Sequence, residues 1–551
     1  MSVDELRIHG VAAAPGLALA QAWQPNGHPG DSADAICADD ESVRDAFAAV
    51  AAEFSALAQT MGSKGLTDEA AILTAESAIA ADEELLADIL AAMAAGTPAG
   101  RAIQTVGESY ARMLEDLESA YLRERAADIR QVIRRALAVL AGGGDNTPPP
   151  KPFVLVDGDV GPVDLLQFAA DGLAGAVSQR GGINAHAAIV ARSLGIPLLL
   201  GIDPEALGVI NGADVLVDGE RAELIVHPAA GTRADATERI AAATDVRERH
   251  ALERDLPAVT SDGRSVLLMC NVASAPEVRI GFAARAVGVG LLRTELPFLT
   301  AEHWPTERAH RDALTPIFEQ LDGVQVTVRL LDFSNDKVPP FLTSGREGLD
   351  ALLENPDALR AQLSAVLDVG RRAKTWVMLP MVYDPEQVTT VRAELRSIAT
   401  GLGVPQPPLG IMIELPEAVD RAAELATVAD FFSLGTNDLT ASVLGLNRVD
   451  QGARPALAAH PRVLSRIVET CRAARQAGIS VSVCGDAGGD PLVLPLLLAA
   501  GVRSLSVSPA RVDEVRHRIR RINAAEWAPR LDHALTLADA ESVWSYVEKC
   551  G

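Results

Sequence analysis

The sequence predicts a multidomain α/β protein in which an α/β domain with a helical insertion is followed by a (β/α)8 TIM barrel. Strand-like runs alternate with short helices between residues 145 and 228, as is typical of an α/β domain. Residues 42–140 are instead rich in alanine, leucine and charge at helical spacing. From residue 258 onward, eight strand-like runs alternate with helical stretches over about 290 residues, which favours a barrel.

Composition limits the possible functions. A length of 551 residues suggests several domains, and 48% hydrophobic residues support sizeable cores. The net charge of −25 argues against nucleic acid and anionic membrane surfaces as partners. It allows a basic protein partner, although acidity also simply favours solubility.

The cysteines and the N-terminus bear on the cellular compartment. Five cysteines are scattered without CxxC spacing, so they indicate neither a zinc site nor a disulfide framework. The first residues lack a basic and apolar signal segment, and no apolar run reaches about 18 residues. We therefore expect a cytoplasmic protein without membrane insertion.

The first 150 residues contain an expected pair of strands, a helical region and a linker. Residues 6–23 predict a short strand, a turn and a second strand. In the helical region, glycines near residues 62–65 and 96–100 break the pattern, so four helices or two helical hairpins are expected. Residues 142–150 are rich in glycine and proline and predict a linker.

Further strands and helices are predicted in chain order. In the α/β region the strands are Phe153–Val156, Ala174–Ser178, Ile196–Leu200 and Asp214–Asp218, with a helix at Asp164–Ala170 and a hairpin closed by Glu223–His227. Residues 229–256 are charged and predict a connecting helix. The barrel strands are expected at Ser265–Asn271, Val287–Leu292, Val326–Asp332, Trp376–Val382, Leu409–Glu414, Phe431–Gly435, Ile479–Cys484 and Arg503–Ser508.

One stretch, Gly-Gly-Ile-Asn-Ala-His at residues 181–186, predicts a glycine turn followed by a helix with His186 in its first turn. The glycines permit positive φ, and Asn184 is a plausible N-cap. Because a helix start favours a nearby anion, this histidine could accept a phosphoryl group. A lone histidine beside a glycine turn is more often structural, so other motifs must decide.

Polar residues gather where the predicted barrel strands end, namely Asn271, Arg293, Asp332, Glu414, Asn437, Asp438 and Cys484. Catalytic residues of such barrels lie at this face. A buried apolar strand that ends in a charged residue is hard to explain by packing alone, so a functional role is favoured.

Five motifs follow the histidine stretch: Gly-Leu-Leu-Arg-Thr-Glu (290–295), Val-Arg-Leu-Leu-Asp (328–332), Ile-Glu-Leu-Pro (413–416), Gly-Thr-Asn-Asp-Leu-Thr (435–440) and Val-Cys-Gly-Asp (483–486). Over nearly the whole chain, they resemble enzyme I of the bacterial phosphoenolpyruvate-dependent sugar phosphotransferase system, in the PEP-utilising enzyme family. The resemblance implies a phosphohistidine domain at 1–23 and 145–228, and a helical insertion at 24–144 that binds the phosphocarrier protein HPr. It also implies a linker helix at 229–256 and a PEP-binding dimerisation barrel at 257–551.

A site for phosphoenolpyruvate needs cations, a metal and a proton donor. Arg293 and Arg329 are suited to grip phosphate, because a guanidinium offers fork geometry. Glu414 and Asp438 offer hard oxygen ligands that suit Mg²⁺. Ordinary ion pairing is the alternative role for the two arginines.

Three further residues complete the predicted chemistry. Asn437 can orient phosphate or carboxylate, and Arg448 could hold the other end of the substrate. Cys484 could deliver the proton that converts the enolate into pyruvate, although a lone cysteine is more often a small buried hydrophobe.

The resemblance assigns the same roles. It implies that His186 is the phosphohistidine, that Cys484 is the proton donor, that Arg293, Arg329, Asn437, Asp438 and Arg448 contact substrate, and that Glu414 and Asp438 bind Mg²⁺. The implied reaction transfers the phosphoryl group of phosphoenolpyruvate to His186 and then to HPr, with release of pyruvate. The implied assembly is a homodimer formed through the barrel.

The chain departs from the family pattern in three places. Asn184-Ala185 replaces a Thr-Ser pair before the histidine, so two hydroxyls are missing. Residues 338–349, after Lys337 in a family-like stretch, are shortened, and a phosphate-binding arginine is displaced to Arg346 or absent. Asp486 stands where Glu is usual.

Two alternative functions follow. These departures leave open a regulatory paralogue that binds carrier proteins with little turnover. A dikinase is disfavoured, because the chain has neither room for an ATP-binding domain nor a P-loop sequence.

Overall fold

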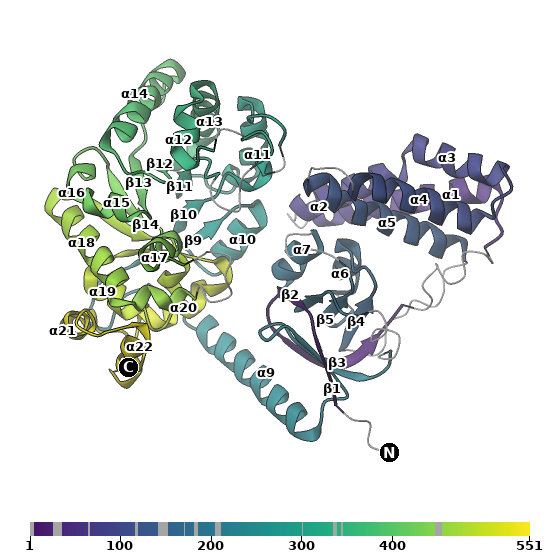
Figure 1. Cartoon of the computed structure of the whole chain (residues 1–551), viewed down its shortest axis with the longest axis horizontal. Coiled ribbons are helices and arrows are strands. Elements are labelled where there is room, and N and C mark those ends of the chain that lie inside the picture. The colour runs from purple at the N-terminus through teal and green to yellow at the C-terminus, as the bar shows by residue number, and fades with distance from the viewer. Residues whose placement is uncertain are drawn as a thin grey trace. The chain divides into compact units, whose positions relative to one another are not determined.

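A computed structural model of the chain (Figure 1) describes residues 5–25, 36–63, 67–115, 120–141, 152–169, 171–180, 186–203, 211–299, 301–333, 339–342, 345–446 and 454–550. The chain divides into two compact units, Met1–Asp245 and Val246–Gly551. Among the described residues, no helix is both long and apolar enough to cross a lipid bilayer.

The first unit contains an eight-stranded sheet in the order β1-β8-β7-β3-β4-β5-β6-β2. Its strands are β1 (Leu6–His9), β2 (Val11–Ala14), β3 (Leu17–Trp23), β4 (Phe153–Asp157), β5 (Leu173–Ser178), β6 (Leu198–Leu200), β7 (Asp214–Asp218) and β8 (Glu223–Val226). Neighbours from β3 to β6 run parallel, and the remaining neighbours run antiparallel. The predicted α/β class is confirmed.

The prediction of two strands within residues 6–23 was wrong, because the structure has three. β1 pairs with β8 at one edge of the sheet, whereas β2 pairs with β6 at the other edge. Gly10 connects β1 to β2, and a Cβ atom there would lie 2.7 Å from the carbonyl oxygen of Leu200. Gly16 then takes a φ of +125°, which favours glycine, before β3 begins.

Between β3 and β4 the described residues form five helices: α1 (Asp40–Ser63), α2 (Thr67–Ala80), α3 (Glu83–Ala94), α4 (Ala99–Glu115) and α5 (Ala120–Leu140). The expected count of four was wrong. The missed break lies at Asp82, whose carboxylate accepts the N–H groups of Glu84 and Leu85 as the N-cap of α3.

The helical region packs against the α/β part of the same unit. One apolar cluster joins Phe54 of α1 and Ile133 of α5 to Phe153 and Phe168 of the α/β part. Arg135 on α5 forms ion pairs with Glu53 on α1 and Asp164, at 3.0 and 2.9 Å. Asp164 belongs to α6 (Pro162–Ala169), so this arginine ties two helices of the insertion to the sheet layer.

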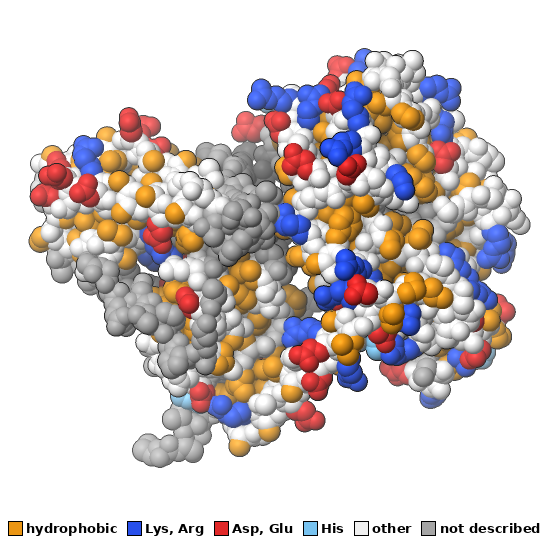
Figure 2. Space-filling view, turned by 180° about the vertical axis from the view of Figure 1, so that it is seen from behind, with side chains coloured by type: hydrophobic (Ala, Val, Ile, Leu, Met, Phe, Trp, Pro, Cys, Tyr) orange, Lys and Arg blue, Asp and Glu red, His pale blue; other side chains and the backbone are white. Residues whose placement is uncertain are grey.

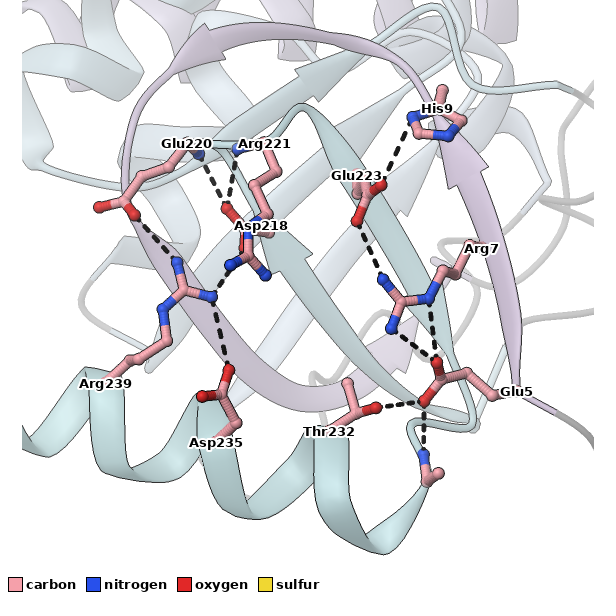
Figure 3. Close-up of polar contacts among 11 residues, drawn as sticks. Glu5, Arg7, His9, Asp218, Glu220, Arg221, Glu223, Thr232, Asp235 and Arg239 are labelled. Atoms are coloured by element: carbon pink, nitrogen blue, oxygen red, sulfur yellow. Dashed lines mark hydrogen bonds and ion pairs between the residues drawn. The ribbon is translucent and has the colours of Figure 1, made fainter. Parts of the chain in front are cut away.

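A long helix, α9 (Ala230–Ala251), continues from the sheet and corresponds to the predicted connecting helix. At its start the Glu5 carboxylate accepts the Ala229 N–H at 2.8 Å and the Thr232 hydroxyl at 2.6 Å (Figure 3). These hydrogen bonds lower the pKa of Glu5 to about 2. Arg239 pairs with buried Asp218 of β7 at 3.0 Å. The first half of α9 is therefore fixed to the sheet.

The second unit is a closed barrel in the order β10-β11-β12-β13-β14-β15-β16-β9, with every neighbouring pair parallel. Its strands are β9 (Leu267–Val272), β10 (Gly288–Leu292), β11 (Gln325–Arg329), β12 (Lys374–Leu379), β13 (Leu409–Ile413), β14 (Phe431–Leu434), β15 (Ser480–Val483) and β16 (Ser504–Val507). The eight predicted strands and the barrel are confirmed.

Helices surround the barrel (Figure 1). They are α10 (Ala275–Ala283), α11 (Glu307–Phe318), α12 (Gly348–Leu353), α13 (Pro356–Val369), α14 (Pro385–Leu402), α15 (Pro416–Asp420), α16 (Ala422–Leu425), α17 (Thr436–Leu444), α18 (Pro461–Ala477), α19 (Leu494–Ala500), α20 (Val512–Ile519), α21 (Ala524–Ala534) and α22 (Ala540–Cys550). Figure 2 shows Lys and Arg side chains interspersed with Asp and Glu over one face of the barrel unit.

The buried side chain of His310 on α11 should make the folding stability of the barrel sensitive to acid. It is buried against the ring of Phe298 at 4.8 Å, and neither ring nitrogen has a hydrogen-bond partner among the described residues. Burial lowers the pKa of His310 from 6.5 to about 4. Because the unfolded chain binds this proton first, stability is complete above pH 6.5 and falls by about 3 kcal/mol as the pH drops towards 4.

The expectation is tested with His310→Phe, which keeps a ring without the titrating group. Urea unfolding between pH 4 and 7 should show a shallower loss of stability for His310→Phe than for the wild type. Equal pH dependence of the two proteins would contradict the expectation.

Candidate active site

The carboxyl ends of the barrel strands bring six of the predicted residues to one mouth. Arg293 follows β10, Arg329 ends β11, Glu414 follows β13 and Cys484 follows β15, whereas Asn437 and Asp438 begin α17 after β14. The side chains of Arg329, Glu414 and Cys484 interact electrostatically with one another. The charge of Arg293 also interacts with the Cys484 thiol, and the charge of Asp438 interacts with the Glu414 carboxylate. The strand ends therefore assemble a mixed cationic and anionic mouth.

Arg329 is held rigidly by two carboxylates. Its Nη2 lies 2.6 Å from Glu295 Oε1, and its Nη1 lies 2.7 Å from Asp332 Oδ2. Burial disfavours the charged form, but Glu295, Asp332 and Glu414 outweigh it and raise the pKa of Arg329 above its usual value. Its buried Nε–H has no partner among the described residues, so one donor of a permanently charged group remains available.

The loop after β10 is fastened to the same strand as Arg329. The Thr294 hydroxyl donates to the Arg329 carbonyl at 2.8 Å and accepts from the Gln362 side-chain amide at 2.9 Å. Gln362 in turn accepts the Leu331 N–H at 3.0 Å. Sequence reasoning missed Glu295 and Gln362 as supporting residues; the motif at 290–295 contained the signal only for Glu295.

Glu414 has the features expected of a cation ligand. It is 1% exposed, and its Oε1 accepts the Met381 N–H at 2.7 Å. Its Oε2 is buried and has no hydrogen-bond partner among the described residues. Burial, followed by the charges of Asp332 and Asp438, raises the pKa of Glu414 well above its usual value. A buried carboxylate oxygen without a partner is costly, and a bound cation would remove that cost.

Mg²⁺ is a metal that the carboxylates at this mouth could hold. Among the described residues, no group of three His, Cys, Asp or Glu side chains could hold a metal by itself. Mg²⁺ is usually bound through one or two carboxylates together with substrate phosphate and water. Glu414 and Asp438 supply that smaller set.

Gly435 leaves room for the Glu414 side chain. A Cβ atom there would lie 2.9 Å from Glu414 Cβ and 3.0 Å from its Oε2. The φ of −84° at Gly435 suits alanine, so space is the constraint rather than backbone strain. We expect Gly435→Ala to displace the carboxylate and lower kcat by about tenfold or more, because a small displacement of a catalytic group is costly.

The measurement is kcat together with the Mg²⁺ concentration for half-maximal activity. Gly401→Ala on α14 is the matched control, because a Cβ there meets no atom within 4 Å. If Gly435→Ala keeps wild-type values for both quantities, the close packing against Glu414 has no functional importance.

Cys484 is a buried thiol at the same mouth. It is 3% exposed and lies with Leu291, Met378 and Met412 in an apolar cluster of the barrel. Burial raises the pKa of the Cys484 thiol to about 11, although the Ser433 hydroxyl and Arg329 oppose the rise. The thiol therefore stays protonated at neutral pH, as a proton donor must.

Asn437 forms two hydrogen bonds with Asp486, which stands where the family pattern has a glutamate. Its Nδ2 donates to Asp486 Oδ2 at 2.8 Å, and its Oδ1 accepts the Asp486 N–H at 3.1 Å. Both residues line a cavity of about 170 Å³ together with Thr440 and Arg454. The aspartate that replaces a glutamate thus still orients the Asn437 amide.

Several predicted site residues lie outside the described atoms. His186 begins α7 (His186–Leu194), after β5, but only its backbone is described. Arg448, Lys337 and the predicted N-cap Asn184 are not among the described residues. Arg346, the candidate for the displaced arginine, is exposed and pairs with Glu354 at 3.0 Å.

The fold and the mouth define a (β/α)8-barrel protein with arginines, acidic side chains and a thiol at the carboxyl ends of its strands. Profiles of one family match most of the chain: "PEP-utilising enzyme, N-terminal" at residues 9–125, "PEP-utilising enzyme, mobile domain" at 149–222 and "PEP-utilising enzyme, PEP-binding domain" at 247–524. The chain belongs to the PEP-utilising enzyme family, as the sequence motifs predicted.

Individual relatives extend this result. A phosphoenolpyruvate-protein phosphotransferase of Cupriavidus necator is 32% identical over 97% of this chain and 97% of its own length. A second phosphoenolpyruvate-protein phosphotransferase, from Bacillus sp. (strain S), is 30% identical over 100% of this chain and 99% of its own length. A multiphosphoryl transfer protein of Rhodobacter capsulatus is 34% identical over 86% of this chain, which spans 59% of that relative's length. A solved "N-terminal domain of Enzyme 1 - Nitrogen" is 29% identical and covers 42% of this chain and 99% of its own, with a TM-score of 0.30.

Proposed function

We propose that this chain is a phosphoenolpyruvate-protein phosphotransferase. It transfers the phosphoryl group of phosphoenolpyruvate to His186, and then to a histidine of HPr or an HPr-like domain, with release of pyruvate. The observation that supports this best is the assembly of Arg329, Glu414 and Cys484 at one barrel mouth. Relatives that match nearly their whole length carry this enzyme's name.

Substrate binding rests on fixed positive charge. Arg329 cannot swing away, because Glu295 and Asp332 hold both of its terminal nitrogens. Its remaining Nε–H and the guanidinium of Arg293 bind the phosphate of phosphoenolpyruvate. Asn437 and Arg448 hold the carboxylate end of the substrate.

Glu414 and Asp438 hold Mg²⁺ in this proposal. The unpartnered Oε2 of Glu414 supports the assignment. When bound, Mg²⁺ neutralises negative charge on the transferring group and orients substrate oxygens.

The chemical step is a balanced displacement. An imidazole nitrogen of His186 attacks phosphorus, and the bond between phosphorus and the enol oxygen breaks. The resulting enolate takes a proton on its methylene carbon from the Cys484 thiol and leaves as pyruvate. The thiol, kept protonated by burial, then regains its proton from solvent.

The remaining parts of the chain receive their roles from this reaction. The helical insertion of residues 24–144 presents the carrier protein to His186, within a phosphohistidine domain of residues 1–23 and 145–228. Residues 229–256 link it to the barrel of residues 257–551, through which two copies form a homodimer. The proposed setting is the cytoplasm, as the first step of sugar uptake by phosphotransfer.

The proposal is tested by mass spectrometry after incubation with phosphoenolpyruvate and Mg²⁺. We expect one acid-labile phosphoryl group on the peptide that contains His186, and one equivalent of pyruvate. His186→Ala should lose the label and at least about 10³-fold of pyruvate formation, because the covalent step disappears. His9→Ala, an exposed histidine of the same unit, is the matched control.

Adding HPr separates turnover from a purely regulatory role. The proposed enzyme releases pyruvate continuously while HPr becomes phosphorylated, whereas a regulatory paralogue would bind HPr without this turnover. Label that persists on His186→Ala would show that another residue is the nucleophile.

A further inference from the structure

Both backbone polar groups of Cys484 are fastened to other strands. Its N–H donates to the Leu434 carbonyl of β14 at 3.2 Å. Its carbonyl accepts the side-chain amide of Asn271, with Nδ2 at 2.9 Å. The thiol itself makes a long contact, 3.7 Å from Sγ to the Leu434 oxygen, and lies beside the Ser433 hydroxyl. The direction of the thiol therefore depends on its main chain as well as on its own contacts.

Asn271 reaches Cys484 across an intervening strand. It comes from β9, which pairs with β16, and β16 pairs with β15. The preceding residue, Cys270, faces the outer helices, because a Cβ on Gly281 of α10 would lie 2.6 Å from its Sγ. Side chains alternate along a strand, so Asn271 faces the barrel interior.

Two small residues pack together in the strands that flank β9, and the Asn271 amide makes its hydrogen bond on the same side. A Cβ atom on Gly290 of β10 would lie 2.5 Å from the Cβ of Ser506 on β16. The buried Oδ1 of Asn271 has no partner among the described residues, so within them its side chain bonds only to the Cys484 carbonyl.

We propose that Asn271 is a positioning residue for proton delivery by Cys484. This inference rests on the function proposed above. By fixing the Cys484 carbonyl, Asn271 fixes the direction of the Cα–Cβ bond and holds the S–H towards the methylene carbon of the enolate. The proton moves from sulfur to carbon and leaves a thiolate, which solvent reprotonates. Without Asn271 the enolate dissociates before its methylene carbon is protonated.

The test compares two signals in one reaction with phosphoenolpyruvate and Mg²⁺. Quench-flow follows phosphorylation of the protein, and lactate dehydrogenase follows pyruvate. Lactate dehydrogenase reduces only the keto form. Enolate that leaves before protonation on carbon takes a proton on oxygen from solvent, and the slow conversion of this enol into pyruvate produces a lag. General damage to the barrel slows both signals together and produces no lag.

The informative variants are Asn271→Leu, which is nearly isosteric and cannot donate, and Asn271→Ala. We expect phosphorylation rates within about threefold of wild type, a lag in pyruvate, and a rate constant for the single equivalent of pyruvate lower by about tenfold, as for loss of one buried hydrogen bond. Cys484→Ala should show the same lag. Cys270→Ala perturbs β9 from its outer side and should show none.

Two results would overturn the inference. Asn271→Leu or Asn271→Ala that folds and gives pyruvate without a lag shows that the amide only supports the strand end. If phosphorylation and pyruvate formation are slowed equally in these variants, the amide likewise only supports the strand end. Absence of a lag in Cys484→Ala would instead refute the proton-donor role within the proposed function, and unphosphorylated wild type would refute that function.

Discussion

Glu414→Gln should abolish turnover while making the protein without metal more stable. The glutamine oxygen can still accept the Met381 N–H, but the neutral amide loses a ligand charge for Mg²⁺. We expect kcat to fall by at least about 10³-fold, since the metal contributes several kcal/mol of charge stabilisation. Because its pKa is raised on folding, Glu414 costs stability increasingly as the pH rises above its unfolded value of 4.5.

The measurement is thermal unfolding with and without Mg²⁺ and phosphoenolpyruvate. Wild type should be stabilised by ligand, as binding to the native state requires, whereas Glu414→Gln should respond little. Without ligand, the variant should unfold at a higher temperature than wild type, with a difference that grows with pH. Glu417→Gln, an exposed neighbour on α15, is the control. A variant that still responds to Mg²⁺ like wild type would refute the ligand role.

Arg329→Met should destabilise the barrel and abolish activity. The guanidinium is 4% exposed and pairs with two buried carboxylates, Glu295 and Asp332. Removing one partner of a buried ion pair leaves uncompensated charge and costs about 3–5 kcal/mol. Arg329→Lys keeps the charge but loses the fork that contacts both carboxylates, so it should be intermediate in stability and nearly inactive.

Urea unfolding and steady-state kinetics together separate the two effects. The triple variant Arg329→Met, Glu295→Gln, Asp332→Asn removes the unpaired charges, so it should regain stability without regaining activity. Arg360→Met breaks an exposed pair with Glu394 and should leave stability nearly unchanged. Activity in the refolded triple variant would show that Arg329 supports the structure without binding phosphate.

The repeating elements could be predicted because their signal is local. Each barrel strand is a short apolar run between helical stretches, and the structure places all eight within a few residues of the expected ranges. The motifs after these strands converge because parallel strands of a barrel end at one face. Arg329, Glu414 and Cys484 therefore came together as expected.

Other features depended on contacts that the sequence does not display. The break at Asp82 was missed because its neighbours continue the helical pattern, and only the N-cap hydrogen bonds interrupt it. The third strand in residues 6–23 was missed because strands β1 and β2 pair at opposite edges of one sheet. That pairing joins residues distant in the chain, and no local periodicity encodes it.

The sequence by itself determined the family, the barrel and the residue types at its mouth, because period and motif are properties of neighbouring residues. Only the tertiary structure decided the state of those residues: which carboxylates hold Arg329, which oxygen of Glu414 lacks a partner, and which amide fastens Cys484. Charge, burial and hydrogen bonding depend on all the atoms around a group, and folding brings those atoms from strands far apart in the chain.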